Sequence, residues 1–99
     1  MQEIKLYEDV FDELENGKRC TIRKGYKDIS LGAVSFKSTE TNRNRYYEVW
    51  MVYHCKLKHV LPDDLISDGF DSHSDMEQQM KRFYSDITLD DEVTVIKFK

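Results

Sequence analysis

The chain has 99 residues, a size that gives one domain with one core and excludes a large enzyme with separate substrate and cofactor domains. Hydrophobic residues make up 39% and charged residues 34%, enough apolar mass for a folded core, and no apolar run reaches the roughly 18 residues that a membrane helix needs. The N-terminus MQEIKLYEDV lacks the basic-then-apolar order of a signal peptide, so we expect a cytoplasmic protein that binds no membrane.

Charge is unevenly distributed along the chain. The net charge is -4, yet residues 17–60 carry ten Lys and Arg against three acids, and the segments on either side are acidic. If the central segments fold side by side, they form a positive surface that attracts phosphate or another anion. Alternatively, the bases and acids interleave in space and cancel. The sequence leaves both arrangements open.

Short elements are predicted in the first part of the chain. Residues 4–6 are typical of a strand, and the apolar spacing that follows, with Gly17 as a C-terminal cap, predicts a helix over residues 7–16. Alternating residues over 19–23 predict a second strand, with the odd and even positions on opposite faces. A third strand is centred on residues 34–36.

The longest β signal covers residues 46–57, where the odd positions suit a core. A strand of this length fits a bent strand shared by two sides of a barrel. Residues 92–98, rich in Val and Ile, predict a last strand. Five or six strands with two or three helices make an α+β domain, and we predict a small open β-barrel.

Two helices are predicted between these strands. Pro62 begins a short helical turn that ends near Gly69, because proline is tolerated in a first turn. A capping box, Ser74-x-x-Glu77, begins the next helix. The apolar face of that helix comprises Met76, Met80, Phe83 and Tyr84.

Cysteine and histidine give no sign of a bridge or a metal. The two cysteines, Cys20 and Cys55, cannot make a disulfide framework, and we expect them to be small buried hydrophobic residues without a bridge. The candidate zinc ligands lack the necessary spacing; they are His54, Cys55, His59 and His73. We therefore expect neither a metal site nor a cofactor.

A lysine, a hydroxyl and an arginine lie close together at the junction between the first helix and the second strand. A Lys18 amine whose pKa is lowered by burial can take a proton from Thr21, whose oxygen then attacks a carbonyl carbon. Arg23 can stabilise the developing negative charge. The alternative is an exposed basic edge strand without a chemical role.

Acidic and aromatic residues supply further candidates. Acids gather around the short helix, where a carboxylate can handle protons or bind a ribose hydroxyl, or can simply begin the helix and favour its dipole. These acids are Asp63, Asp64, Asp68 and Asp71. Four aromatic side chains can stack on a base or, equally, pack in the core or at the barrel edge. They are Tyr26, Tyr46, Trp50 and Phe70.

Taken in order, these motifs resemble the ASCH domain, a small β-barrel related to PUA domains. The resemblance covers nearly the whole chain. It rests on Gly17, Lys18-Arg19-Cys20-Thr21-Ile22-Arg23, Leu31-Gly32, the long strand over 46–57, Asp68-Gly69-Phe70, Tyr84 and Val95-Ile96-Lys97-Phe98.

Among ASCH proteins, single domains of about this length are the bacterial N4-acetylcytidine amidohydrolases. The resemblance implies Thr21 as nucleophile, Lys18 as its base, Asp68 as the catalytic carboxylate and Arg23 in the substrate pocket. The hydrolases carry Glu where this chain has Asp68. Their spacing from the glycine to the threonine is also one residue longer, so counting forward from the glycine places Arg19, rather than Lys18, in the lysine position.

The leading hypothesis is thus an ASCH-type domain that binds a nucleoside, nucleotide or single-stranded RNA and hydrolyses N4-acetylcytidine, with Arg23 or a backbone amide holding the oxyanion. The expected substrate-binding residues are Arg19, Arg23, Tyr26 and Phe70.

Two other classes of function stay open. One is a non-catalytic RNA-binding module, whose phosphate contacts would be Arg19, Arg23, Lys24, Arg43 and Arg45. The other is a small acidic protein that binds and inhibits a nucleic-acid-binding partner, using its acidic helices and exposed aromatics such as Trp50. We expect a monomer or a weak dimer.

Overall fold

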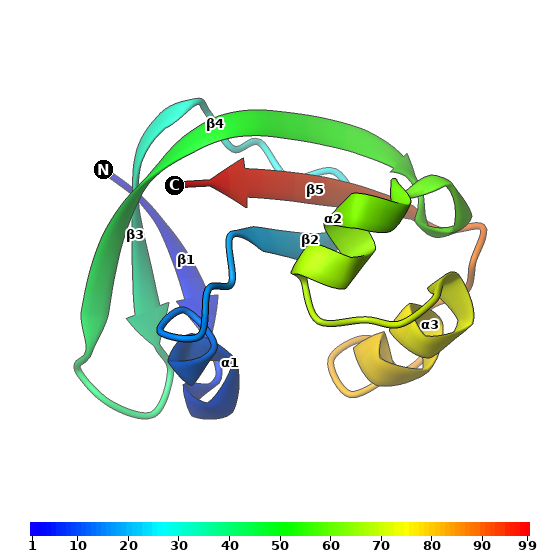
Figure 1. Cartoon of the computed structure of the whole chain (residues 1–99), viewed down its shortest axis with the longest axis horizontal. Coiled ribbons are helices and arrows are strands. Elements are labelled where there is room, and N and C mark those ends of the chain that lie inside the picture. Colours follow the sequence, from blue (N-terminus) through cyan, green and yellow to red (C-terminus); the bar gives the residue numbers. More distant parts are fainter.

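A curled sheet of five strands forms the body of the molecule, and the computed structural model describes all of residues 1–99 (Figure 1). Its strands are β1 (Gln2–Leu6), β2 (Cys20–Lys24), β3 (Gly32–Ser38), β4 (Asn44–Lys56) and β5 (Glu92–Phe98). The order across the sheet is β1-β3-β4-β5-β2, with β1 and β3 parallel and every other pair antiparallel. The predicted α+β fold with a curled, barrel-like sheet is confirmed.

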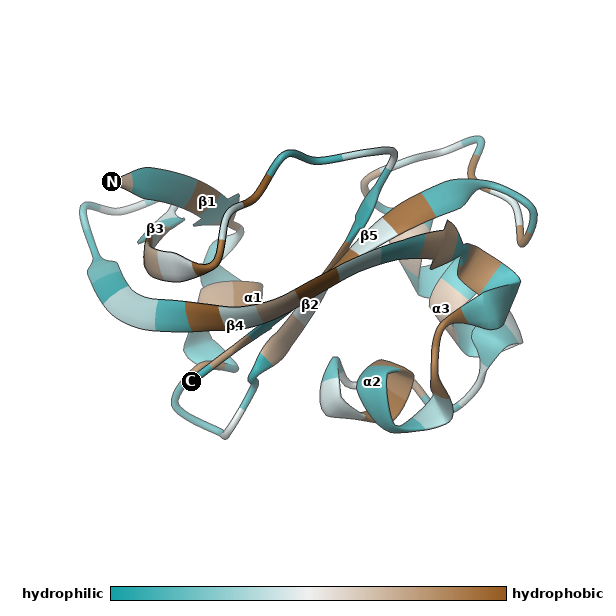
Figure 2. Cartoon of the chain, turned by 90° about the horizontal axis from the view of Figure 1, so that it is seen from above, coloured by the Kyte–Doolittle hydropathy of each residue, from teal (hydrophilic) through white to brown (hydrophobic).

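Strand β4 is shared by the two sides of the sheet, as its length predicted. Its first half pairs with β3 and its second half with β5, and it runs along the molecule from the β1 and β3 side to the α3 side (Figure 2). The register shifts between Val49 and Met51. This irregularity reverses the alternation, so that Met51 is exposed and Val52 turns toward the core. The prediction that every odd position faces a core is therefore wrong at Met51.

Three short α-helices flank the sheet: α1 (Glu8–Asp12), α2 (Pro62–Ser67) and α3 (His73–Met80), with one 3₁₀ turn, η1 (Leu57–His59). Helix α1 is shorter than the predicted 7–16, because tighter turns continue the chain from Asp12 to Gly17. Figure 1 shows α1 beside β1 and β3, and α2 and α3 at the other end of the sheet.

The start and end of α3 differ from the prediction. Its N-cap is Ser72, whose hydroxyl accepts a hydrogen bond from the Asp75 backbone N–H at 3.0 Å, so the cap lies two residues before Ser74. The helix ends at Met80. Phe83 and Tyr84, predicted on its apolar face, therefore lie beyond the helix, where Phe83 is exposed.

The apolar core consists of two clusters, where the sequence predicted one. One cluster joins β2 and β5 to α2 and α3, and the other joins β1, β3 and the first half of β4 to α1. Strand β5 contributes to both, since Val93 and Val95 face the first cluster while Ile96 and Phe98 face the second. The sheet therefore buries opposite faces at its two ends.

The curl brings the two edge strands, β1 and β2, toward each other. The Arg23 guanidinium on β2 donates a hydrogen bond of 3.0 Å from Nη2 to the Lys5 carbonyl on β1. Because the strands are otherwise unpaired along these edges, the space between them is open to a ligand.

Candidate functional site

A cavity of about 850 Å³ lies between the two edge strands, α1, the end of α2 and the segment after α3. The residues that line it include Lys18, Thr21, Arg23, Asp68, Phe70 and Tyr84. The cavity thus brings together residues from both ends of the chain.

Lys18 and Asp68 form an ion pair in this cavity, from Lys18 Nζ to Asp68 Oδ1, although they are 50 residues apart in sequence. Their side chains are only 7% and 8% exposed. Burying two charges is costly unless each has a close partner. In this buried pair each charge is the close partner of the other, and both side chains line the cavity.

Two similar chain reversals deliver these charges. Gly17, with φ of 97°, follows the turns after α1, and the next residue, Lys18, donates its backbone N–H to the Glu13 carbonyl at 3.0 Å. Gly69, also with φ of 97°, follows α2, and Phe70 donates to the Leu65 carbonyl at 2.9 Å. Gly69 thus follows the end of α2 directly, whereas Gly17 ends the run of turns after α1. The C-cap of α1 is Glu13, so the prediction of Gly17 as the cap of that helix is wrong.

Asp68 is the C-cap residue of α2. A carboxylate at a helix C-terminus is opposed by the partial negative charge of the terminal carbonyl groups. The contacting Lys18 ammonium compensates for this repulsion. The acid-glycine-aromatic motif is thus a helix end that also presents a carboxylate to the cavity.

Thr21 lies on β2 and is 4% exposed. Its side chain points away from the cluster that contains its neighbours Cys20 and Ile22, because successive strand residues face opposite sides. It lines the same cavity as Lys18 and Asp68. The hydroxyl makes no hydrogen bond within the chain, which leaves it free to react.

Burial lowers the pKa of the Lys18 amine from an ordinary 10.5 to about 8, and the nearby Arg23 guanidinium acts in the same direction. The contacting Asp68 carboxylate acts in the opposite direction, since a negative charge favours the ammonium. Burial also lowers the pKa of Arg23, and the Tyr84 phenol opposes that shift. Burial is the largest of these influences, and it favours the neutral amine that a general base requires.

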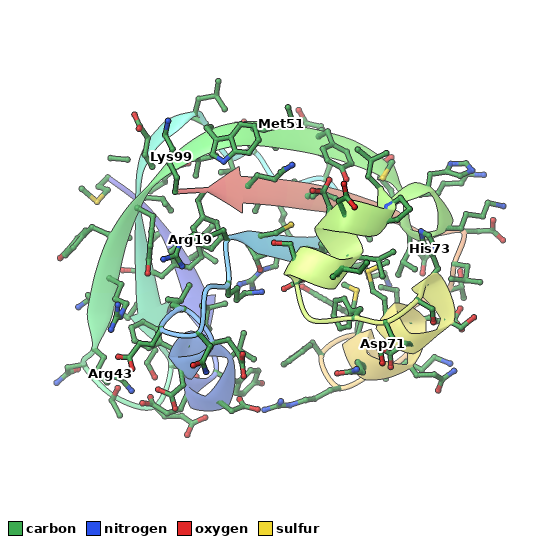
Figure 3. All side chains as sticks on the ribbon, viewed as in Figure 1. Arg19, Arg43, Met51, Asp71, His73 and Lys99 are labelled. Carbon is green, nitrogen blue, oxygen red and sulfur yellow. The ribbon has the colours of Figure 1, made fainter.

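Two of the expected substrate-binding residues lie outside the cavity. Arg19 precedes β2 and donates from Nη1 to the Lys18 carbonyl at 2.6 Å and the Leu14 carbonyl at 3.1 Å, with its guanidinium over the Tyr47 ring (Figure 3). Tyr26 stacks on His54 with ring centroids 4.1 Å apart. Neither Arg19 nor Tyr26 therefore lies among the residues that line the cavity.

The structure also shows which of the two neighbouring basic residues, Lys18 or Arg19, lines the cavity. Lys18 precedes the first residue of β2, Cys20, so strand alternation does not direct its side chain. The turn at Gly17 sends Lys18 to the cavity, whereas the Arg19 donors are taken up by backbone carbonyl oxygens. Counting back from Thr21 therefore identifies the lysine at the cavity.

Five of the ten basic residues of the central segment pair with acids from the ends of the chain. Arg43, at the β3–β4 turn beside α1, pairs with Glu8, Asp12 and Glu15 (Figure 3). The other surface pairs are Arg45–Glu15, Lys24–Asp86 and Lys58–Asp90. Of the two arrangements open to the sequence, the structure shows interleaved charges.

An aromatic and basic cluster at the cavity was missed from the sequence. The Tyr7 and Phe83 rings stack with centroids 5.3 Å apart, and the Arg82 guanidinium lies over both rings while it pairs with Asp9. All four residues line the cavity. The sequence placed Phe83 on a helix face. In the structure the helix ends at Met80, and Phe83 lies beyond this end, where its ring stacks on Tyr7.

Asp64 lies in the first turn of α2, as one of the two predicted alternatives requires, and it makes further contacts. It is 2% exposed, accepts a hydrogen bond of 2.5 Å from the Tyr53 hydroxyl and pairs with Lys97 at 2.9 Å. It therefore joins α2 to β4 and β5, and it does not line the cavity.

The structure contains no group of three or more His, Cys, Asp or Glu side chains that could hold a metal ion. Cys20 and Cys55 are free thiols, and burial raises the pKa of Cys20 to about 12. None of the helices has both the length and the apolar character needed to cross a membrane.

Comparison with known proteins identifies the fold. No family model and no curated protein sequence matches the chain. The ASCH domain of Lactobacillus crispatus JV V101 matches with a TM-score of 0.75 and 14% identity over 99% of this chain and 79% of that domain. The ASCH protein of Zymomonas mobilis matches with a TM-score of 0.67 and 14% identity over 98% of this chain and 65% of that protein. This chain therefore spans about two thirds of its length. A protein from Enterococcus faecalis V583 matches with a TM-score of 0.69 and 10% identity over 100% of this chain and 79% of that protein.

Proposed function

We propose that this chain, which has the fold of ASCH domains, is an amidohydrolase that removes the acetyl group of N4-acetylcytidine. The observation that carries the proposal is that the buried Lys18–Asp68 pair and Thr21 line the same cavity. A lysine with a lowered pKa, a free hydroxyl and a carboxylate are the groups that acyl transfer through a covalent intermediate requires.

The first half of the reaction forms an acetyl-enzyme. The neutral Lys18 amine takes the Thr21 hydroxyl proton, and the Thr21 oxygen bonds to the acetyl carbon while the carbonyl electron pair moves onto its oxygen. When the carbonyl re-forms, the bond to N4 breaks. The proton on Lys18 passes through Asp68 to N4, which leaves as the amino group of cytidine.

The second half regenerates the enzyme. Asp68 takes a proton from a water molecule, whose oxygen bonds to the acetyl carbon. The bond to the Thr21 oxygen then breaks, and the proton held by Asp68 passes to the Thr21 oxygen. Acetic acid leaves and releases its own proton to the solvent as acetate. Lys18 and Asp68 thus end in their starting protonation states.

The cavity has the size and lining that a nucleoside requires. Its volume of about 850 Å³ lies within the range of roughly 300–1,000 Å³ typical of small-molecule sites. Phe70 and the stacked Tyr7 and Phe83 rings offer apolar surfaces for a base, and Arg82 offers a cation. These features favour a small nucleoside over a long polyanion.

The test is hydrolysis of N4-acetylcytidine followed by liquid chromatography of cytidine. We expect turnover by the natural chain and a loss of at least about a thousandfold in Thr21→Ala, since the nucleophile is removed. Thr39→Ala is the matched control, because Thr39 also lines the cavity but is exposed and lies beside the end of β1, where its backbone N–H donates to the Leu6 carbonyl. Full activity in Thr21→Ala, or no turnover by the natural chain, would overturn the proposal.

A further inference from the structure

The open edge of β2 presents a backbone group to the cavity at Ile22. The side chain of Ile22 is 6% exposed and belongs to a core cluster, yet Ile22 lines the cavity. Because its side chain packs in the core, the backbone is the part of this residue that a ligand can reach.

The hydrogen-bond pattern between β2 and β5 establishes which way this backbone points. Phe98 donates to the Arg19 carbonyl at 3.0 Å, and Gly25 donates to the Glu92 carbonyl at 2.7 Å. In an antiparallel pair, hydrogen-bonded positions alternate with positions whose N–H and C=O groups point outward. The odd-numbered positions of β2 therefore bond to β5.

The even-numbered positions, Ile22 and Lys24 among them, point to the open edge. Thr21 pairs with Ile96 in the ladder, while the Ile22 N–H and C=O face away from β5. No turn, loop or side chain hydrogen-bonds to either group of Ile22. An N–H without a partner, next in the chain to a candidate nucleophile, is thus available at the cavity.

We infer that the Ile22 backbone N–H is the oxyanion donor of the reaction, an inference that rests on the proposed function. When the Thr21 oxygen attacks the acetyl carbon, the carbonyl electron pair moves to the oxygen, and the adjacent N–H donates a hydrogen bond to that negative charge. The amide of the residue after the nucleophile serves this purpose in other acyl-transfer enzymes.

With the Ile22 N–H as the oxyanion donor, Arg23 has a positioning role instead. Its guanidinium bridges to the Lys5 carbonyl on the opposite edge strand, so it holds the two edges at a fixed separation. This bridge positions β2 without requiring a contact with the reacting carbonyl. The oxyanion donor is then a rigid strand amide, which costs no reorganisation during the reaction.

An amide-to-ester exchange removes this single N–H. The chain offers the chemistry, because segments 1–19, 20–54 and 55–99 can be joined at the natural Cys20 and Cys55. Replacing Ile22 by its α-hydroxy acid exchanges the N–H for an oxygen and keeps the side chain. The matched control is the same exchange at Lys24, which lies on the same open edge but outside the cavity.

We expect the Ile22 ester to lower kcat on N4-acetylcytidine by about 10²–10³-fold with KM unchanged, because the hydrogen bond forms only in the transition state. The Lys24 ester should keep the kcat of the synthetic all-amide chain. If the Ile22 ester keeps the full kcat, the role of the Ile22 N–H is overturned, while the proposed function stands. An inactive all-amide chain would overturn both the proposed function and this role.

Amide hydrogen exchange tests the geometry without any substrate. The Ile22 N–H should exchange rapidly, whereas the N–H groups of Thr21 and Arg23, which bond to β5, should be protected. Strong protection at Ile22 would show that its N–H already has a partner, and would overturn the inference.

Discussion

Two groups of ion pairs tie distant parts of this chain together, and they differ in burial. The Lys18–Asp68 pair faces the cavity with side chains 7% and 8% exposed, whereas Arg43, with a side chain 40% exposed, joins three acids of α1 and its following turn. Only the buried lysine has a pKa moved close to neutrality. Similar residue pairs therefore serve different ends: the exposed group neutralises surface charge, and the buried pair has the properties of reacting groups.

The largest effect is expected from removing the buried cation. Lys18→Met leaves the Asp68 carboxylate buried without its partner, so unfolding in urea should show a loss of about 3–5 kcal/mol. Deacetylation should also fall by about 10²–10⁴-fold, because the base is absent.

A double variant separates these two effects. In Lys18→Met with Asp68→Leu, no unpaired charge is left, so most of the lost stability should return while activity stays absent. Recovery of activity together with stability would show that the pair is only structural.

A pH effect follows next in size. Because the neutral Lys18 amine is the base, kcat/KM for deacetylation should rise with pH and level off above about 8. A value of kcat/KM that stays constant from roughly pH 6 to pH 9, a range that includes the pKa of the Lys18 amine, would contradict the assignment.

The smallest effect is expected at the exposed group. Arg43→Ala removes three ion pairs on the surface, and we expect only a slight loss of thermal stability, which should shrink further in high salt. Deacetylation and its pH profile should stay unchanged. A large loss of activity would show that the two regions are coupled.

The fold was predicted well because its elements carry local signals. The last strand and the long shared strand follow from β propensity and length, and the structure confirms them. The cap at Ser72 was missed because Ser74 gives a similar local signal, and the register shift at Met51 was missed because it depends on how β4 pairs with β5.

The candidate site was only partly predictable. Lys18, Thr21 and Asp68 were selected by their chemistry and by the resemblance to ASCH domains, and the structure places them around one cavity. Arg19 and Tyr26 lie outside the cavity because the partners that hold their side chains, backbone carbonyl oxygens and a histidine ring, come from tertiary packing. No spacing along the chain encodes such contacts.

The most direct test of the central claim is to trap the acetyl-enzyme. Acid quenching during turnover of N4-acetylcytidine, followed by proteolysis and mass spectrometry, should reveal one acetyl group on the Thr21 side chain, and Thr21→Ala should show none. Sustained turnover in the natural chain with no acetyl group on Thr21 at any quench time would contradict the account.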